Sequence, residues 1–332
     1  MTCLIDGYNR RINYLRISVT DHCNLRCIYC TAHQVPRLRH DEILRYEEIE
    51  RITRMAVSLG VNSLRLTGSE PLMRPDLPAL VKMLKAIDGI KDISMTTNGI
   101  TLARHAQELA DAGLDRVNIS LDSLKEEKFR YMTGLGKLSD VYEGMEAAAK
   151  AGLNPVKINT VVLSGVNDDE ILDFAAKTRD EGWHVRFIEY MPFASDDCGS
   201  GKFSENQTVS DDTIKQIIAT NMGELNPVMP SRGNGPAKYY QLPNTTGTIG
   251  FIGAVTSCFC ATCNRLRLTA DGKLRPCLLD DDEIDIKTPL RAGISDEGII
   301  ELMSQAVAMK HEKHRLGEEI LPASRQMWQI GG

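Results

Sequence analysis

The first 190 residues alternate between short apolar segments with a period of two and longer segments with the apolar spacing of an amphipathic helix. Residues 14–19 begin this order as a strand, and residues 47–59 follow as a helix that ends at Gly60. The order repeats, with predicted strands at 63–67, 92–96, 116–121, 156–162 and 184–190 and predicted helices at 76–87, 101–112, 125–132, 139–151 and 168–181. These six strand–helix units predict a parallel α/β sheet.

The polar residues of this pattern distinguish a partial barrel from a flat, doubly wound sheet. They fall at or near the C-terminal ends of the predicted strands, at Cys23, 67–70, 96–98, Ser120, Asp122, Lys157, Asn159 and 189–191. A barrel gathers these strand ends into one mouth, whereas a flat sheet spreads them along an edge. We therefore predict a partial (β/α)6 TIM-like barrel.

The pattern changes after about residue 192. Beyond it we predict a loop at 194–208, helices at 210–220 and 296–309, and short strands at 238–242 and 247–255. We divide the chain into a barrel domain over residues 1–225 and a C-terminal region over residues 226–332. Residues 1–12 are predicted to form a polar arm on which Arg10 and Arg11 are exposed.

Composition excludes several classes of protein. The 332 residues are 42% apolar and 25% charged, which is typical of a globular chain. A formal charge of −6 gives no electrostatic case for a nucleic-acid partner. No apolar run approaches 18 residues and no secretory signal is evident, so we expect no membrane partner and a cytoplasmic location. The nine cysteines gather at two places, which favours two metal–thiolate sites in a reducing compartment over a disulfide framework.

The first cysteine group is Cys23, Cys27 and Cys30, with spacings of x₃ and x₂. Thiolates suit zinc or iron–sulfur clusters, and a 4Fe–4S cluster takes four ligands. Three cysteines would leave one iron open to a ligand that is not protein. A structural zinc site is the alternative, with His22, His33 or a remote cysteine as the fourth ligand. The spacing favours the cluster, because zinc ligands usually come as two separated pairs.

The second group is Cys260, Cys263 and Cys277. Residues 270–273 predict a turn between two strands, so a hairpin would bring Cys277 back to the other two cysteines. Cys258 is a candidate fourth ligand. From spacing alone, a zinc ribbon and an iron–sulfur cluster are supported equally.

Basic residues lie on or beside the predicted strands, which is unusual unless they are paired or face a cavity. Arg265 and Arg267 point to one face of a strand, and arginine binds phosphate oxygens in a bidentate manner. A pair of surface arginines is the alternative. Further cations of this kind are Arg16, Arg65, Lys157 and Arg186. In an acidic chain they indicate a small polyanionic substrate such as a nucleotide.

These motifs together resemble those of a known enzyme family. Cys23-x₃-Cys27-x₂-Cys30, with Tyr29 before the last cysteine, resembles the radical S-adenosylmethionine (SAM) signature. The turn Thr67-Gly68-Ser69-Glu70-Pro71 resembles the Gly-Gly-Glu-Pro turn of that superfamily. The second cysteine group, Asn264-Arg265-x-Arg267 and the terminal Gly331-Gly332 are similar to the GTP 3′,8-cyclases of molybdenum-cofactor biosynthesis. The resemblance covers nearly the whole chain.

The resemblance implies a radical SAM lyase with two 4Fe–4S clusters, in which C-terminal elements close the open side of the barrel. The first cluster would bind SAM, and an electron donor would drive its cleavage to a 5′-deoxyadenosyl radical. That radical would abstract the ribose 3′ hydrogen of GTP, and the carbon radical would attack C8 of the guanine. The product would be (8S)-3′,8-cyclo-7,8-dihydroguanosine 5′-triphosphate, made in the first step of molybdenum-cofactor (molybdopterin) biosynthesis. The sequence does not decide between a monomer and a homodimer.

Site residues follow from the resemblance by position. SAM would meet Tyr29, Ser69, Ser120 and Met191. GTP would meet Arg16, Arg65, Thr96, Lys157, Arg265, Leu266 and Arg267, with Leu266 acting through its backbone. The residues expected to be catalytic are Arg265, Arg267, Gly331 and Gly332, since the tail would reach into the mouth.

Three departures from the family pattern are visible, and two other functions compete. Ser69 stands where glycine is usual, and Thr31-Ala32 follow Cys30 where Met-Pro is common, which would alter the shielding of the cluster. Cys258 is an unexpected cysteine whose simplest role is that of a small buried side chain. The first competing function is a radical SAM peptide-modifying enzyme with an auxiliary cluster. The second is a zinc-stabilised binding protein, which would purify colourless and without iron.

Overall fold

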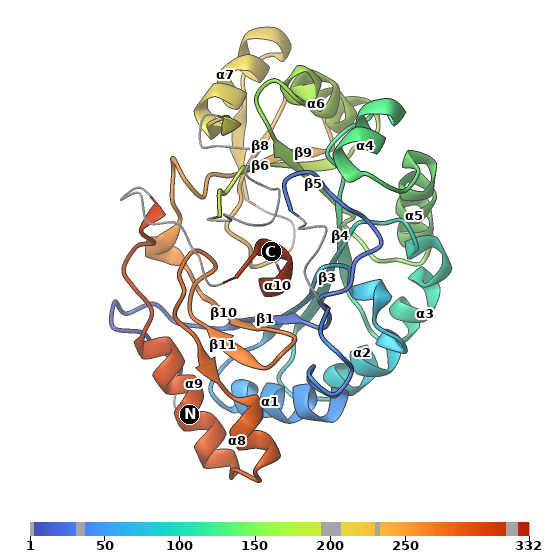
Figure 1. The fold of residues 1–332 in the computed structure, drawn as a ribbon. Coiled ribbons are helices and arrows are strands. Elements are labelled where there is room, and N and C mark those ends of the chain that lie inside the picture. Colours follow the sequence, from blue (N-terminus) through green and yellow to red (C-terminus); the bar gives the residue numbers. More distant parts are fainter. Residues whose placement is uncertain (1–2, 31–36, 194–206, 230–232, 317–324, 332) are drawn as a thin grey trace.

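One curved sheet of twelve strands organises the chain. The computed structural model describes residues 3–30, 37–193, 207–229, 233–316 and 325–331. The predicted loop at 194–208 lies mostly outside these residues. Figure 1 shows the sheet curving around the short C-terminal helix, with the helices of the first half of the chain on its outer side.

The six predicted strand–helix units are confirmed, with ends within about two residues of those expected except at the starts of α3 and α6. The strands are β1 (Tyr14–Ser18), β2 (Ser63–Thr67), β3 (Asp92–Thr97), β4 (Arg116–Ser120), β5 (Lys157–Val162) and β6 (His184–Glu189). The helices are α1 (Tyr46–Ser58), α2 (Leu77–Lys85), α3 (Ala106–Asp111), α4 (Glu126–Thr133), α5 (Leu138–Lys150) and α6 (Ile171–Asp180). Before α3 and α6, short 3₁₀ turns at Leu102–Arg104 and Asp168–Glu170 replace the first turn of the predicted helix.

The C-terminal part contains more regular structure than the sequence pattern predicted. Expected elements are α7 (Asp211–Met222), β8 (Lys238–Gln241), β9 (Thr248–Ile252), β10 (Arg265–Leu268), β11 (Lys273–Arg275) and α9 (Asp296–Ala308). Elements that were not predicted are β7 (Asn226–Val228), β12 (Ile284–Asp285), α8 (Lys287–Arg291) and α10 (Met327–Ile330). Each of these has five residues or fewer, too short for a hydrophobic period to show.

The strand order is β12-β11-β10-β1-β2-β3-β4-β5-β6-β9-β8-β7. Strands β1 to β6 are parallel neighbours, as a partial barrel requires. The expected closure by C-terminal elements takes a different form, because the sheet is not closed by hydrogen bonds. Instead, the C-terminal part adds a parallel strand at each edge, β10 beside β1 and β9 beside β6.

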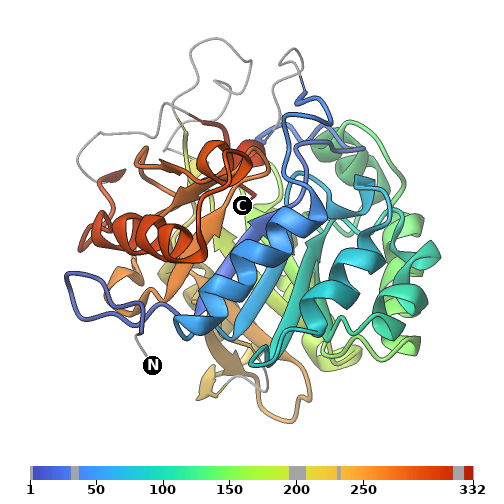
Figure 2. The ribbon, with the colours of Figure 1, turned by 90° about the horizontal axis from the view of Figure 1, so that it is seen from below.

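The two faces of the strands carry different side chains. In β1, Leu15 and Ile17 belong to the apolar core that packs under the helices, whereas Tyr14 and Arg16 line a cavity on the inner face. Helix α9 lies beside α1 on the outer side, where Arg51 Nε donates to Asp296 Oδ1 at 2.9 Å (Figure 2). The apolar outer face therefore holds the strands in place, and the inner face is left for polar groups.

The prediction of an exposed Arg10 is wrong. Its side chain is buried, and Nε donates to Asp6 Oδ2 at 2.5 Å. The other two nitrogens donate to three backbone carbonyls: Nη1 to Cys260 and Glu312 (2.8 and 2.9 Å), and Nη2 to His311 (2.6 Å). A buried guanidinium is stable when its donors are satisfied in this way. Arg11 is exposed, as expected.

Glu70 ties the ends of β2 and β3 together. Its fully buried carboxylate accepts from Leu72 N (3.1 Å), Thr97 Oγ1 (2.7 Å) and Asn98 N (2.7 Å). Burial raises its pKa to about 7, although the three donors act in the opposite direction. These contacts give Glu70 a structural role in the turn. No helix among the described residues is long and apolar enough to cross a membrane.

We expect Glu70→Gln to destabilise the protein by about 1–3 kcal/mol at pH 8, where the carboxylate is ionised. The glutamine amide keeps one acceptor oxygen but places an NH₂ group against one of the three hydrogen-bond donors, which loses its acceptor. Denaturant unfolding of the cluster-loaded protein measures the change, with the exposed Glu127→Gln as the control. Equal stability of the two variants would show that the three hydrogen bonds do not hold the strand ends.

Candidate active site

The first cysteine group lies in a loop at the C-terminal end of β1. Two backbone hydrogen bonds attach this loop to the end of α4, from Arg26 N to Thr133 O (2.8 Å) and from Ile28 N to Met132 O (2.9 Å). Cys23, Cys27 and Cys30 line one cavity, together with the predicted SAM residues Tyr29, Ser69, Ser120 and Met191. The structure thus brings together all seven residues that the sequence assigned to SAM and its cluster.

The surroundings of Cys23 and Cys27 favour the protonated form of their thiols. Burial raises the pKa of Cys23, and it raises that of Cys27 well above the usual value, with Cys30 and Asp122 adding to the effect. Tyr29 is held by its hydroxyl, which donates to Asp122 Oδ2 at 2.5 Å. Asp122 also accepts from Val161 N at 2.8 Å, and burial raises its pKa to about 6. The sequence pattern singled out Asp122 only as a polar strand end.

The second cysteine group is assembled by the predicted hairpin. Strands β10 and β11 pair antiparallel, with Arg267 opposite Arg275, and this returns Cys277 to Cys260 and Cys263. All three cysteines line a second cavity. The pKa of Cys263 is lowered to about 6 by Arg265 and Lys310 although burial acts in the opposite direction, whereas burial raises that of Cys260 to about 11.

The two groups lie at opposite ends of the same parallel strands. Cys23 follows the C-terminal end of β1, while Cys263 directly precedes the N-terminal end of its parallel neighbour β10. Five strand residues span about 16 Å. The two cavities share the lining residues Thr96, Asn159, Ile188 and Met191, so they adjoin along the inner face of the sheet.

Three arginines form a row across the strands between these two ends. The register pairs Arg16 of β1 with Arg267 of β10 on one side and with Arg65 of β2 on the other. All three line the second cavity, as do Arg265 and Arg186. Among the described residues, neither Arg65 nor Arg267 forms a salt bridge with a carboxylate, whereas Arg116 pairs with Asp92 at 2.6 Å.

The arginine row (Arg16, Arg65 and Arg267) is electrostatically costly without an anion. Burial lowers the pKa of Arg16 well below its ordinary value, and Arg267 and Arg65 lower it further. Burial likewise lowers the pKa of Arg267 to about 10, with Arg265 contributing. Like charges in a low-dielectric cavity repel one another, and a bound polyanion relieves that repulsion.

The C-terminal tail reaches this row. The carbonyl oxygen of Gly331 accepts from Arg267 Nη1 (3.0 Å), Thr67 Oγ1 (3.3 Å) and Arg16 Nη2 (3.4 Å). Gly331 has a φ of 76°, and a Cβ there would collide with Thr67 Oγ1. These contacts place Gly331 beside the arginines of the inner face, on the side where the tail was expected. Gly332 lies outside the described residues.

The wide spacing of the thiols fits an iron–sulfur cluster better than one metal ion. A single zinc ion with bonds of 2.0–2.3 Å requires ligand atoms within about 4.6 Å of one another. In neither three-cysteine group of the described chain do all three sulfur atoms lie within 4.8 Å of one another. Each group nevertheless opens its three thiols to one cavity.

Two of the residues expected to meet GTP lie outside the cavity lining. Leu266 packs its side chain in the apolar core, so only its backbone could contact a ligand. Lys157 is buried, with Nζ 3.3 Å from Tyr239 Oη. Sequence reasoning missed Trp328 and the role of Asn98, whose Nδ2 donates to Cys23 Sγ at 3.9 Å and to Asn24 Oδ1 at 2.7 Å. Asn98 was visible as a polar strand end, whereas nothing in the pattern indicated Trp328.

Comparison with known proteins places this arrangement in a family. Residues 17–177 match the family model of the radical SAM superfamily, and residues 183–316 match that of Molybdenum Cofactor Synthesis C. The chain is 49% identical to the GTP 3′,8-cyclase of Heliobacterium modesticaldum, over 99% of this chain and 100% of the relative. It is 47% identical to that of Pelotomaculum thermopropionicum, over 98% and 99%. The chain belongs to the GTP 3′,8-cyclase family.

A solved structure supports the fold. The crystal structure of Streptococcus suis SuiB bound to S-adenosylmethionine is similar, with a TM-score of 0.59 at 17% identity. The similarity covers 81% of this chain and 61% of SuiB. At this identity the likeness concerns the fold alone, and it agrees with the partial barrel of the radical SAM superfamily.

Ser69, in the turn that follows β2, contacts the tail. Its Oγ donates to Trp328 O at 3.2 Å, while its backbone nitrogen donates to Thr20 O. We expect Ser69→Ala to loosen α10 by about 1 kcal/mol, which is a roughly fivefold faster amide exchange over residues 327–331. Ser69→Thr keeps the hydroxyl and serves as the control. Unchanged exchange in Ser69→Ala would show that this hydrogen bond does not hold the tail.

Proposed function

We propose that this chain catalyses the radical SAM cyclisation of GTP to (8S)-3′,8-cyclo-7,8-dihydroguanosine 5′-triphosphate, the first step of molybdenum-cofactor biosynthesis. The family membership supports the reaction class. The observation that carries the substrate is the arginine row, which lies between two three-cysteine groups and has no carboxylate partner at Arg65 or Arg267 among the described residues.

The cysteine groups assign a position to each cofactor. Cys23, Cys27 and Cys30 would hold one 4Fe–4S cluster, and Cys260, Cys263 and Cys277 another, each with an iron left open by the missing fourth thiolate. The bound cluster would supply the electron for the reductive cleavage of SAM to methionine and a 5′-deoxyadenosyl radical. Tyr29, Ser69, Ser120 and Met191 would surround SAM, since they line the cavity of the first group.

The side chains of the second cavity would bind and orient the nucleotide. Arg16, Arg65 and Arg267 would neutralise the triphosphate, and bidentate contacts would fix its direction along the strands. Thr96 and Met191 line both cavities, so a ribose held near them would lie between SAM and the second cysteine group. Helix α10 and Gly331 would cover this region, and exclusion of water protects a carbon radical from side reactions.

The tail also links binding to catalysis. Arg267 and Arg16 both donate to Gly331 O, so the tail orients the guanidinium groups that would meet the substrate. We assign Arg265, Arg267, Gly331 and Gly332 to this catalytic region. Two clusters bound by thiolates require a reducing compartment, which supports a cytoplasmic location and an intracellular electron donor.

The proposed reaction is tested by anaerobic incubation of the reconstituted protein with SAM, a strong reductant and GTP. We expect 5′-deoxyadenosine to form in dependence on GTP, together with a cyclised nucleotide visible by mass spectrometry. ATP in place of GTP is the control for a general nucleotide effect. Formation of 5′-deoxyadenosine that is independent of GTP, without a cyclised product, would refute the cyclase and favour a radical SAM enzyme with another substrate, such as a peptide.

Substitution of single cysteines is expected to distinguish the two proposed clusters by iron content and activity. Cys277→Ser should keep about four of roughly eight iron atoms per chain and lower product formation at least about 100-fold, because Cys260 and Cys263 alone are too few thiolates to hold the second cluster. Cys3→Ser, which changes a cysteine outside both groups, is the matched control and should keep all the iron. Full activity of Cys277→Ser would contradict the assignment of the second cluster.

A further inference from the structure

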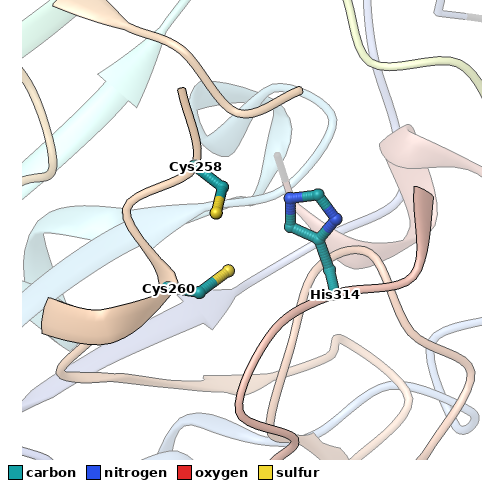
Figure 3. A group of neighbouring side chains, drawn as sticks. All are labelled: Cys258, Cys260 and His314. Atoms are coloured by element: carbon teal, nitrogen blue, oxygen red, sulfur yellow. The ribbon is translucent and has the colours of Figure 1, made fainter. Parts of the chain in front are cut away.

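Cys258 is a cysteine that the proposed reaction does not use. Its thiol, the thiol of Cys260 and the imidazole of His314 all lie within 4.8 Å of one another. Figure 3 shows both sulfur atoms and the imidazole ring facing one small space between two segments of the chain. One segment follows β9 and carries the cysteines, and the other follows α9 and carries His314. His314 is buried, whereas the two cysteines are half-buried.

The two segments are fixed to each other without any ligand. Arg10 donates through the same Nη1 to Cys260 O and Glu312 O, so it joins the cysteine segment to the histidine segment. The ring of His314 is held at Nε2 by Ala254 O (2.6 Å) and at Nδ1 by Leu316 N (3.4 Å). The three donor groups are therefore close together before an ion arrives, and ligation exchanges only one of these two ring hydrogen bonds for a metal bond.

The donor set has a defined chemical preference. Two thiolates and one neutral imidazole suit zinc or another soft divalent ion in tetrahedral coordination, with the fourth position left to water. All three donor atoms lie within 4.8 Å of one another, and one ion requires them within about 4.6 Å, so small side-chain rotations are enough to complete the site. This distinguishes them from the two wider three-cysteine groups.

We propose that Cys258, Cys260 and His314 form a binding site for a single soft divalent cation such as Zn²⁺, and that this ion and the second cluster exclude each other. Both would require the thiolate of Cys260. Binding releases the two thiol protons to solvent and leaves a neutral Cys₂His centre. The exclusion rests on the proposed cluster role of Cys260, whereas the ion site itself does not. The chain would thus have two metal states, of which only one has the second cluster.

The ion site is tested with Co²⁺ as a spectroscopic probe. Full-length protein without clusters, kept reduced and anaerobic, is titrated, and the visible absorption of tetrahedral thiolate-bound Co²⁺ is followed. We expect Cys258→Ser and His314→Gln each to weaken one Co²⁺ binding event at least about tenfold. Cys277→Ser should bind Co²⁺ as the unmodified chain does. Equal loss in Cys277→Ser and Cys258→Ser, or no loss in Cys258→Ser, would overturn the proposal.

Iron content and competition test the exclusion. Cys258→Ser should take up roughly eight iron atoms per chain on reconstitution, whereas Cys277→Ser should take up about four. Cluster-loaded protein should bind one Co²⁺ fewer than cluster-free protein, and an equal number would refute the exclusion. These measurements do not depend on turnover. A failure of the GTP assay with the expected Co²⁺ result would therefore reject the proposed function and leave the ion site intact.

Discussion

Repulsion between buried like charges is the constraint on which the inner face of this sheet depends. The register places Arg267, Arg16 and Arg65 on three neighbouring strands at the same level, and neighbouring strands lie about 4.8 Å apart. Guanidinium groups this close in a low-dielectric cavity destabilise one another. They stay in place because the outer face of the same strands is fully packed. The apolar side chains there are fully buried, at Leu15, Ile17, Leu64 and Leu66.

The same parallel pairing explains why two cysteine groups distant in sequence line adjoining cavities. Strand β10 is near the end of the chain, yet it lies beside β1 and runs in the same direction. Cys263 therefore lies at the start of this strand pair and Cys23 at its end, with the arginine row between them. A polyanion on the row would keep one end of a nucleotide fixed while its other parts extend toward the cysteines. A peptide without acidic side chains offers no comparable charge to relieve the repulsion among these arginines.

The sequence predicted what depends on local patterns. The six strand–helix units appeared through their hydrophobic period, and the β10–β11 hairpin through its turn residues. Each cysteine group appeared through its spacing, and the cations through their unusual place on strands. Contacts between distant segments could not be predicted in this way. Arg10 has the composition of an exposed arm but is buried against carbonyls from residues 260, 311 and 312.

The other features that the sequence did not predict depend on strand register or on contacts between distant segments. The sequence around Arg16 does not predict that Arg65 and Arg267 lie opposite it on the neighbouring strands. A shift of the strand register by one residue would place Arg16 opposite a leucine. The nearness of His314 to Cys258 depends on how the segment after α9 returns to the loop after β9. The position of β10 also differs from the expected closure, because a strand that joins β1 in parallel extends the sheet instead of sealing it.

The tail shows how a segment with few contacts can matter to this charged site. Gly331 offers one carbonyl oxygen to donors from three different strands, Arg16 of β1, Thr67 of β2 and Arg267 of β10. Its left-handed backbone conformation and the close approach of Thr67 leave no room for a side chain. The carbonyl provides only a partial negative charge, so it lessens the repulsion within the arginine row without satisfying it. Arg65 and Arg267 form no salt bridge among the described residues, so their positive charge is still available to a polyanion.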